Sequence, residues 1–68
     1  MGIIKKARIA AGLSQEQLAE KVGVSQGAVA QWESGITHPS FKVLKPLAGA
    51  LKITLDELVE AGDAVSND

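Results

Sequence analysis

Apolar residues recur along this chain at helical spacing, and short polar or glycine-containing segments separate the runs. In residues 3–11, Ile4, Ala7 and Ala11 lie three or four positions apart, which places them on one side of a helix. Similar spacing recurs in later segments, and no run alternates apolar and polar residues as a half-buried strand does. The pattern predicts an all-α fold with five helices, in residues 3–11, 15–22, 26–34, 40–51 and 55–61.

Capping residues support these helix ends. Ser14 is followed three positions later by Gln17, and Thr54 by Glu57, and this spacing is that of a capping box at a helix N-terminus. Ser25 is a further N-cap candidate before the third helix. Glycines, which end helices readily in the left-handed conformation, follow four of the segments, at Gly12, Gly23, Gly35 and Gly62.

The fourth segment is the least regular of the five. Phe41, Leu44 and Leu51 have helical spacing, but Pro46 lacks a backbone donor and Gly49 costs about 1 kcal/mol relative to alanine. We expect this helix either to begin late, with Pro46 in its first turn, or to bend at Pro46.

Short loops require consecutive helices to pack as neighbours, so the chain should form a compact five-helix bundle. The 68 residues suffice for one domain, which we assign to residues 1–61, with an acidic, frayed tail at 62–68. The predicted core consists of Leu13, Leu18, Val22, Val29, Trp32, Leu44, Leu47 and Leu51.

Composition narrows the possible chemistry. The chain has no cysteine and one histidine, so we expect no disulfide, no metal centre and no cofactor. No apolar run approaches the roughly 20 residues that cross a bilayer, and the first residues lack the order of a signal peptide. These features predict a cytoplasmic protein without a membrane or small-molecule partner. Catalytic triads, paired carboxylates in a pocket and phosphate-binding glycine loops are also missing, so we expect no enzyme.

The charge is unevenly distributed. Residues 1–52 hold all seven basic residues and three acidic ones, a balance of +4, whereas residues 53–68 hold five acidic residues and no basic one. Local potential decides what approaches a surface, because charges beyond roughly 10 Å are screened. An acidic end held away from a nucleic-acid interface would therefore interfere little with binding, although both ends can equally be ordinary solvated surface.

Residues 15–34 have the pattern of a helix-turn-helix, in which the second helix enters the major groove of DNA. Gly23 stands where the chain must reverse, and Ala19 where the two helices approach closely. With Val29 and Trp32 turned inward, the candidate base-reading residues are Gln26, Gly27, Ala28 and Gln31. A glutamine amide pairs with N6 and N7 of adenine, and the methyl group of Ala28 suits a thymine methyl. The alternative is that these small polar residues only keep an exposed helix soluble.

Phosphate contacts are expected at helix N-termini and in the loop after the second helix of the motif. The candidates are Ser14, Gln15, Ser25, Thr37, His38, Ser40 and Lys42. Arg8 falls on the apolar side of the first helix, and Glu33 lies at the end of the third. We predict that the two form a half-buried salt bridge, the alternative being a free Arg8 that contacts phosphate.

The resemblance to a known family rests on one segment, ARIAAGLSQEQLAEKVGVSQGAVAQWESG. It resembles the Cro and phage-repressor type of helix-turn-helix, also called XRE-like or lambda-repressor-like, over residues 3–60. The resemblance implies a phosphate contact at Gln15, base-facing positions at Gln26, Gly27 and Gln31, and an Arg8–Glu33 bridge between helices. It further implies a bacterial or phage-encoded homodimer on near-palindromic, double-stranded DNA. The chain departs from the pattern at Gly27, where a reading side chain is common.

Together these features predict a sequence-specific transcriptional regulator, in particular a repressor that binds DNA as a homodimer. A small dimer seam is available at Ile53, Leu55, Leu58 and Val59, unless these residues only close the monomer core. The alternative function is an antitoxin-like or coactivator-like subunit that uses the same fold to bind a protein.

Overall fold

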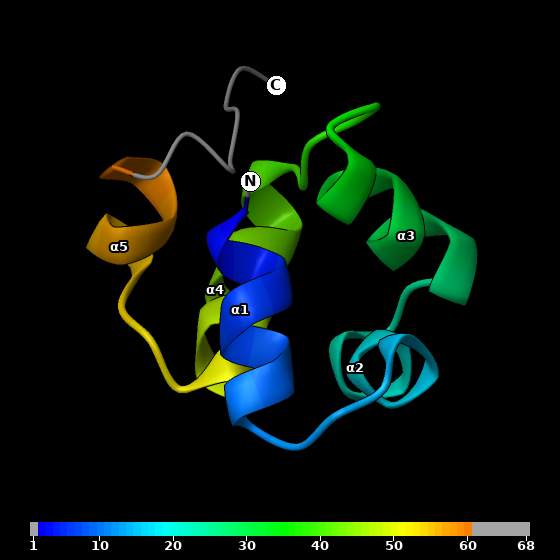
Figure 1. Cartoon of the computed structure of the whole chain (residues 1–68). Coiled ribbons are helices and arrows are strands. Elements are labelled where there is room, and N and C mark those ends of the chain that lie inside the picture. The colour runs from blue at the N-terminus through cyan, green and yellow to red at the C-terminus, as the bar shows by residue number, and fades with distance from the viewer. Residues whose placement is uncertain (1, 61–68) are drawn as a thin grey trace.

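A computed structural model describes residues 2–60, which form five α-helices and no strand (Figure 1). The helices are α1 (Ile3–Ala10), α2 (Gln15–Val22), α3 (Gln26–Ser34), α4 (Phe41–Leu51) and α5 (Leu55–Glu60). In Figure 1, α1 and α4 occupy the middle of the molecule, α2 and α3 lie on one side of them, and α5 lies on the other. The predicted all-α five-helix fold is confirmed.

Within residues 2–60, every helix is too short or too polar to cross a membrane.

Local hydrogen bonds define the helix starts as the sequence predicts. The Ser14 hydroxyl accepts from the Gln17 N–H at 3.0 Å, and the Gln17 side chain accepts from the Ser14 N–H at 2.8 Å. Thr54 and Glu57 form the same reciprocal pair at α5, with distances of 3.0 and 2.8 Å. Both capping boxes satisfy backbone donors that have no partner within their helix. Gly62 and the predicted tail at 62–68 lie outside the described residues.

Helix α4 begins at Phe41 and continues through Pro46 to Leu51, so the expectation of a late start is wrong. Pro46 cannot donate to the carbonyl of Lys42 four residues earlier. Both residues are exposed, and water is therefore available to this carbonyl. Instead of a glycine, Lys52 ends the helix in the left-handed region with φ 60°, and the Ile53 N–H bonds to the Ala48 carbonyl at 3.0 Å.

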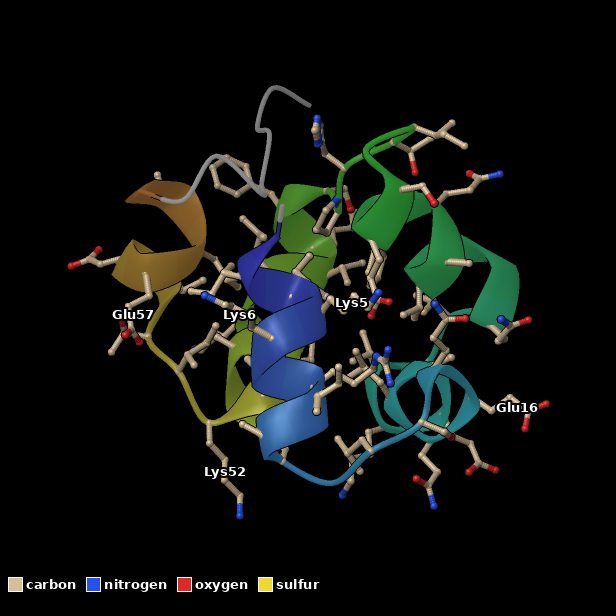
Figure 2. All side chains as sticks on the ribbon, viewed as in Figure 1. Lys5, Lys6, Glu16, Lys52 and Glu57 are labelled. Carbon is tan, nitrogen blue, oxygen red and sulfur yellow. The ribbon has the colours of Figure 1, made fainter. Side chains whose placement is uncertain are left out.

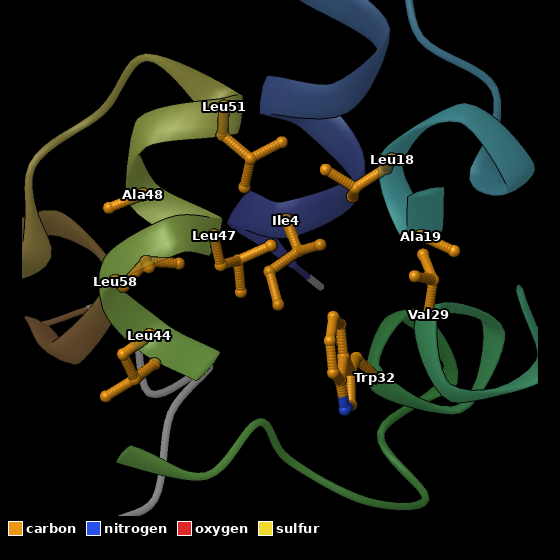
Figure 3. Close-up of a cluster of buried hydrophobic side chains, with 10 residues drawn as sticks. All are labelled: Ile4, Leu18, Ala19, Val29, Trp32, Leu44, Leu47, Ala48, Leu51 and Leu58. Carbon is orange, nitrogen blue, oxygen red and sulfur yellow. The ribbon is translucent and has the colours of Figure 1, made fainter. Parts of the chain in front are cut away.

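The hydrophobic core draws on all five helices (Figure 3). Its buried members are Ile4, Leu18, Ala19, Val29, Trp32, Leu44, Leu47, Ala48, Leu51 and Leu58. Of the predicted core residues, Leu13 and Val22 are only partly buried at its edge. Phe41, which the spacing assigned to the apolar side of its helix, is 61% exposed because it is the first residue of α4.

Candidate nucleic-acid interface

Helices α2 and α3 are joined by a tight turn at residues 23–25. Gly23 has φ 86° in the left-handed region, and its N–H and that of Val24 bond to the Ala19 carbonyl at 2.8 and 3.0 Å. Ala19 is only 3% exposed, and its small side chain lets the two helices approach closely. The Ser25 hydroxyl then starts α3 by accepting from the Ala28 N–H at 3.1 Å. In Figure 1, α2 is seen nearly end-on while α3 runs across the view, which is the expected helix-turn-helix arrangement.

Helix α3 has a buried side and an exposed side. Val29 is fully buried and Trp32 is 9% exposed, and both project into the core (Figure 3). Gln26, Gly27 and Gln31 are exposed. We call these three residues the reading face. Ala28, the fourth predicted base-reading residue, is partly buried and packs against the core.

The reading face is not covered by the other described helices. Helix α5 lies on the far side of α1 and α4 from α3 (Figure 1), so the acidic residues Asp56 and Glu57 are held away from the reading face. The reading face therefore remains accessible to a ligand as far as residues 2–60 are concerned.

A chain of side-chain hydrogen bonds runs from α1 to the reading face. The Arg8 guanidinium donates to Glu33 from Nε at 2.7 Å and from Nη2 at 3.2 Å, and from Nη1 to the Leu13 carbonyl at 2.8 Å. The Gln15 Nε2 donates to Glu33 Oε1 at 2.9 Å, and Gln26 Nε2 donates to Gln15 Oε1 at 2.7 Å. These contacts tie α1, α2 and α3 together, and they fix the rotation of α3 about its axis.

The Arg8–Glu33 ion pair is largely withdrawn from water, with side-chain exposures of 13% and 5%. Burial by itself would raise the pKa of Glu33, because it disfavours the charged carboxylate. Hydrogen bonds from Arg8 and Gln15 and the positive charges of Arg8 and Lys5 outweigh burial, so the pKa of Glu33 lies below its ordinary 4.5. Lys5 extends from α1 toward α3 (Figure 2). The expected salt bridge is thus present, and Arg8 is not a free surface residue.

The structure gives Gln15 a contact that the sequence did not predict. Its amide bonds to both Glu33 and Gln26, so the expected phosphate contact would have to use its second amide hydrogen. The link between Gln15 and Gln26 was missed because it joins residues on two helices eleven positions apart. Only the angle between α2 and α3 brings the two amides together.

The loop after α3 holds the remaining candidates for phosphate contact. Gly35 has φ 80°, and the N–H groups of Ile36 and Thr37 bond to the Gln31 carbonyl at 3.0 and 3.5 Å. Pro39 is buried and anchors the loop. The predicted residues of this segment, which are Thr37, His38, Ser40 and Lys42, are all exposed. Ser14 and Ser25, the candidates at the other end of the motif, are exposed too, although their hydroxyls already cap α2 and α3.

Among the four residues of the predicted dimer seam, Leu58 fits the alternative that the sequence left open, which is to close the monomer core. Leu58 of α5 is fully buried in the monomer core, and Ile53, in the link between α4 and α5, is partly buried against it. Leu55 and Val59 are 41% and 56% exposed. They alone of the four offer substantial apolar surface to a second copy.

Comparison with known proteins agrees with this arrangement. The chain matches the helix-turn-helix family over residues 4–58. It is 35% identical over 63 residues to the HTH-type transcriptional activator BcrR of Enterococcus faecalis, covering 93% of this chain and 31% of that protein. It is 42% identical over 60 residues to an uncharacterized HTH-type transcriptional regulator of Mycobacterium tuberculosis, covering 87% of this chain and 43% of that protein. A third relative, the uncharacterized regulator YqaE of Bacillus subtilis, is 31% identical over 67 residues, which are 96% of this chain and 58% of YqaE.

The chain belongs to the helix-turn-helix family of the XRE type, as its sequence predicts. All three relatives are named as HTH-type transcriptional regulators, one of them as an activator. The chain spans between about a third and three-fifths of the length of these three relatives.

Proposed function

We propose that this domain binds double-stranded DNA sequence-specifically by placing α3 in the major groove and thereby regulates transcription. The observation that carries the proposal is the reading face of Gln26, Gly27 and Gln31, exposed on a helix whose other side is locked into the core by Val29 and Trp32. A major groove about 12 Å wide admits such a helix, and amide side chains match the edges of its bases.

The charge near the reading face favours recognition through hydrogen bonds over strong attraction to the backbone. Glu33 is the only charged residue of α3, and Arg8 pairs with it. Glu16 points outward from α2 (Figure 2), which disfavours phosphates there. Lys42 is the one lysine among the predicted phosphate contacts, so we expect a modest salt dependence, of about 0.9 log units per phosphate for each log unit of salt.

We further propose a homodimer on a near-palindromic operator, with two α3 helices in successive major grooves about 34 Å apart. The exposed Leu55 and Val59 of α5 support a small seam between the copies. A dimer seated on a promoter would repress by blocking polymerase. The enterococcal relative is named an activator, so repression has to be tested against activation. In vitro transcription from a promoter that carries the operator distinguishes the two.

A binding-site selection on random duplexes, followed by mobility shifts, tests the proposal. The wild type should enrich a two-fold symmetric motif, and Gln26→Ala should lose preference at one position of each half-site, by about 1–3 kcal/mol. Asp56→Ala, on the far helix α5, is the control and should retain the motif. An unchanged motif with Gln26→Ala would remove this residue from base reading, and failure of the wild type to enrich any motif would refute sequence-specific binding.

Salt titration of the same complex separates DNA binding from the alternative role as a protein-interaction subunit. Lys42→Ala should reduce the salt slope by about one unit, whereas Lys45→Ala, three residues further along α4, should leave it unchanged. A protein partner held by the apolar surface of Leu55 and Val59 would respond weakly to salt and equally in both variants.

A further inference from the structure

The two glutamines of the reading face are held by opposite ends of their amides. Gln26 is held through its Nε2, which donates to Gln15 Oε1 at 2.7 Å. The Gln31 Oε1 accepts from the Thr37 hydroxyl through a longer and weaker contact of 3.4 Å. The first contact leaves Gln26 with its carbonyl oxygen and one N–H for a ligand, and the second leaves Gln31 with two N–H donors.

These two sets of groups suit different bases. Adenine presents an N6 amino donor beside the N7 acceptor in the major groove, which matches the one acceptor and one donor of Gln26. Guanine presents two acceptors, N7 and O6, and thymine presents the single acceptor O4. A pair of N–H donors matches guanine best and thymine next, whereas the amino groups of adenine and cytosine repel it.

We propose that Thr37 is a positioning residue that sets the base preference of Gln31. By holding the amide oxygen toward the loop, it turns the amide N–H₂ toward DNA and selects guanine, then thymine, over adenine and cytosine. This inference rests on the proposed function, since it assigns a base class to part of the same reading face. It also gives Thr37 a role different from the phosphate contact that the sequence suggested.

The loop geometry allows the side-chain contact to be tested by itself. The left-handed Gly35, the Ile36 and Thr37 N–H bonds to the Gln31 carbonyl and the buried Pro39 hold the loop through the backbone and the core. Thr37 is exposed, and valine has the same shape without the hydroxyl. Thr37→Val should therefore fold normally while it frees the Gln31 amide to rotate.

The separation of the two glutamines makes their effects distinguishable. Five residues along a helix span about 7.5 Å, which is roughly two base-pair steps at 3.4 Å each. Gln26 and Gln31 should accordingly influence different positions of each half-site.

The experiment is a binding-site selection on random duplexes with the wild-type chain, Thr37→Val, Thr37→Ser and Gln31→Ala, followed by competition between duplexes that differ only at the Gln31 position. The wild type should prefer guanine over adenine there by about tenfold. Thr37→Val should reduce this ratio to near one and leave the Gln26 position unchanged. Thr37→Ser should preserve the preference, and Gln31→Ala should abolish it at the same position.

Three results would overturn the proposal. A wild-type motif that Thr37→Val leaves unchanged would refute the positioning role alone. If Thr37→Val weakens binding to all duplexes equally and makes the salt slope shallower, then Thr37 contacts phosphate. If the wild type enriches no motif, the proposed function fails and this inference fails with it.

Discussion

The two sides of this small bundle hold their outer helices by different means. Helix α3 is anchored by Val29 and Trp32 and also by the directional hydrogen bonds of Arg8, Glu33 and Gln15. Helix α5 is six residues long and, among the described residues, contributes only Leu58 to the buried core. Apolar contacts hold a helix in place, but hydrogen bonds of defined geometry also fix which side it presents. The helix with a defined exposed side is the one that we propose reads DNA.

Removal of the anchor of α5 should have the largest effect. Leu58→Ala deletes a fully buried side chain, so we expect a loss of about 2–5 kcal/mol in the free energy of unfolding. Val59→Ala, at the adjacent exposed position, should cost less than about 0.5 kcal/mol. Urea denaturation followed by Trp32 fluorescence measures both. Equal effects of the two substitutions would mean that Leu58 is not the anchor of α5.

Arg8→Met should have the next largest effect, because it leaves the nearly buried Glu33 carboxylate without its cation. We expect a loss of about 2–3 kcal/mol in the free energy of unfolding, measured by thermal denaturation. Affinity for the selected duplex, corrected for the folded fraction, should fall less. If affinity falls more than stability, then Arg8 contacts DNA directly.

Acidification should lower the free energy of unfolding by a smaller amount, because it removes the charge of Glu33 on α3. The folded-state pKa of Glu33 lies below 4.5, so its contribution is fully present above about pH 4.5 and is lost as the pH falls through the folded-state value. The difference in stability between wild type and Glu33→Gln should therefore shrink as the pH falls below 4.5. Urea denaturation at a series of pH values checks this, and a difference that does not depend on pH would contradict it.

Substitutions on the exposed face of α5 should have the smallest effect on the free energy of unfolding and a larger effect on dimer assembly. Leu55→Ser together with Val59→Ser should change the free energy of unfolding by less than about 1 kcal/mol, since both side chains are substantially exposed. The same pair should weaken cooperative binding of two copies to a palindromic duplex, measured by mobility shift or sedimentation. Unchanged cooperativity would place the dimer contact elsewhere.

Much of the fold and part of the site could be predicted from sequence. Ser14 with Gln17, Ser25, and Thr54 with Glu57 all cap helices as expected, because each cap depends on residues within three positions of one another. The Arg8–Glu33 pair was also predictable, since two opposite charges on inward-facing positions need each other. The sequence could not decide between a late start of α4 and a place for Pro46 inside the helix, because the choice depends on which side of that helix meets water.

The amino-acid sequence by itself determined where most helices of this protein begin and end, and which side of α3 is apolar, because these properties depend on local hydrogen bonds and on the helical repeat. Tertiary structure decided the rest. It buried Leu58 while leaving Leu55 and Val59 exposed, and it brought Gln15 between Glu33 and Gln26. Those outcomes depend on the angles at which helices cross, which are set by packing among residues far apart in the chain.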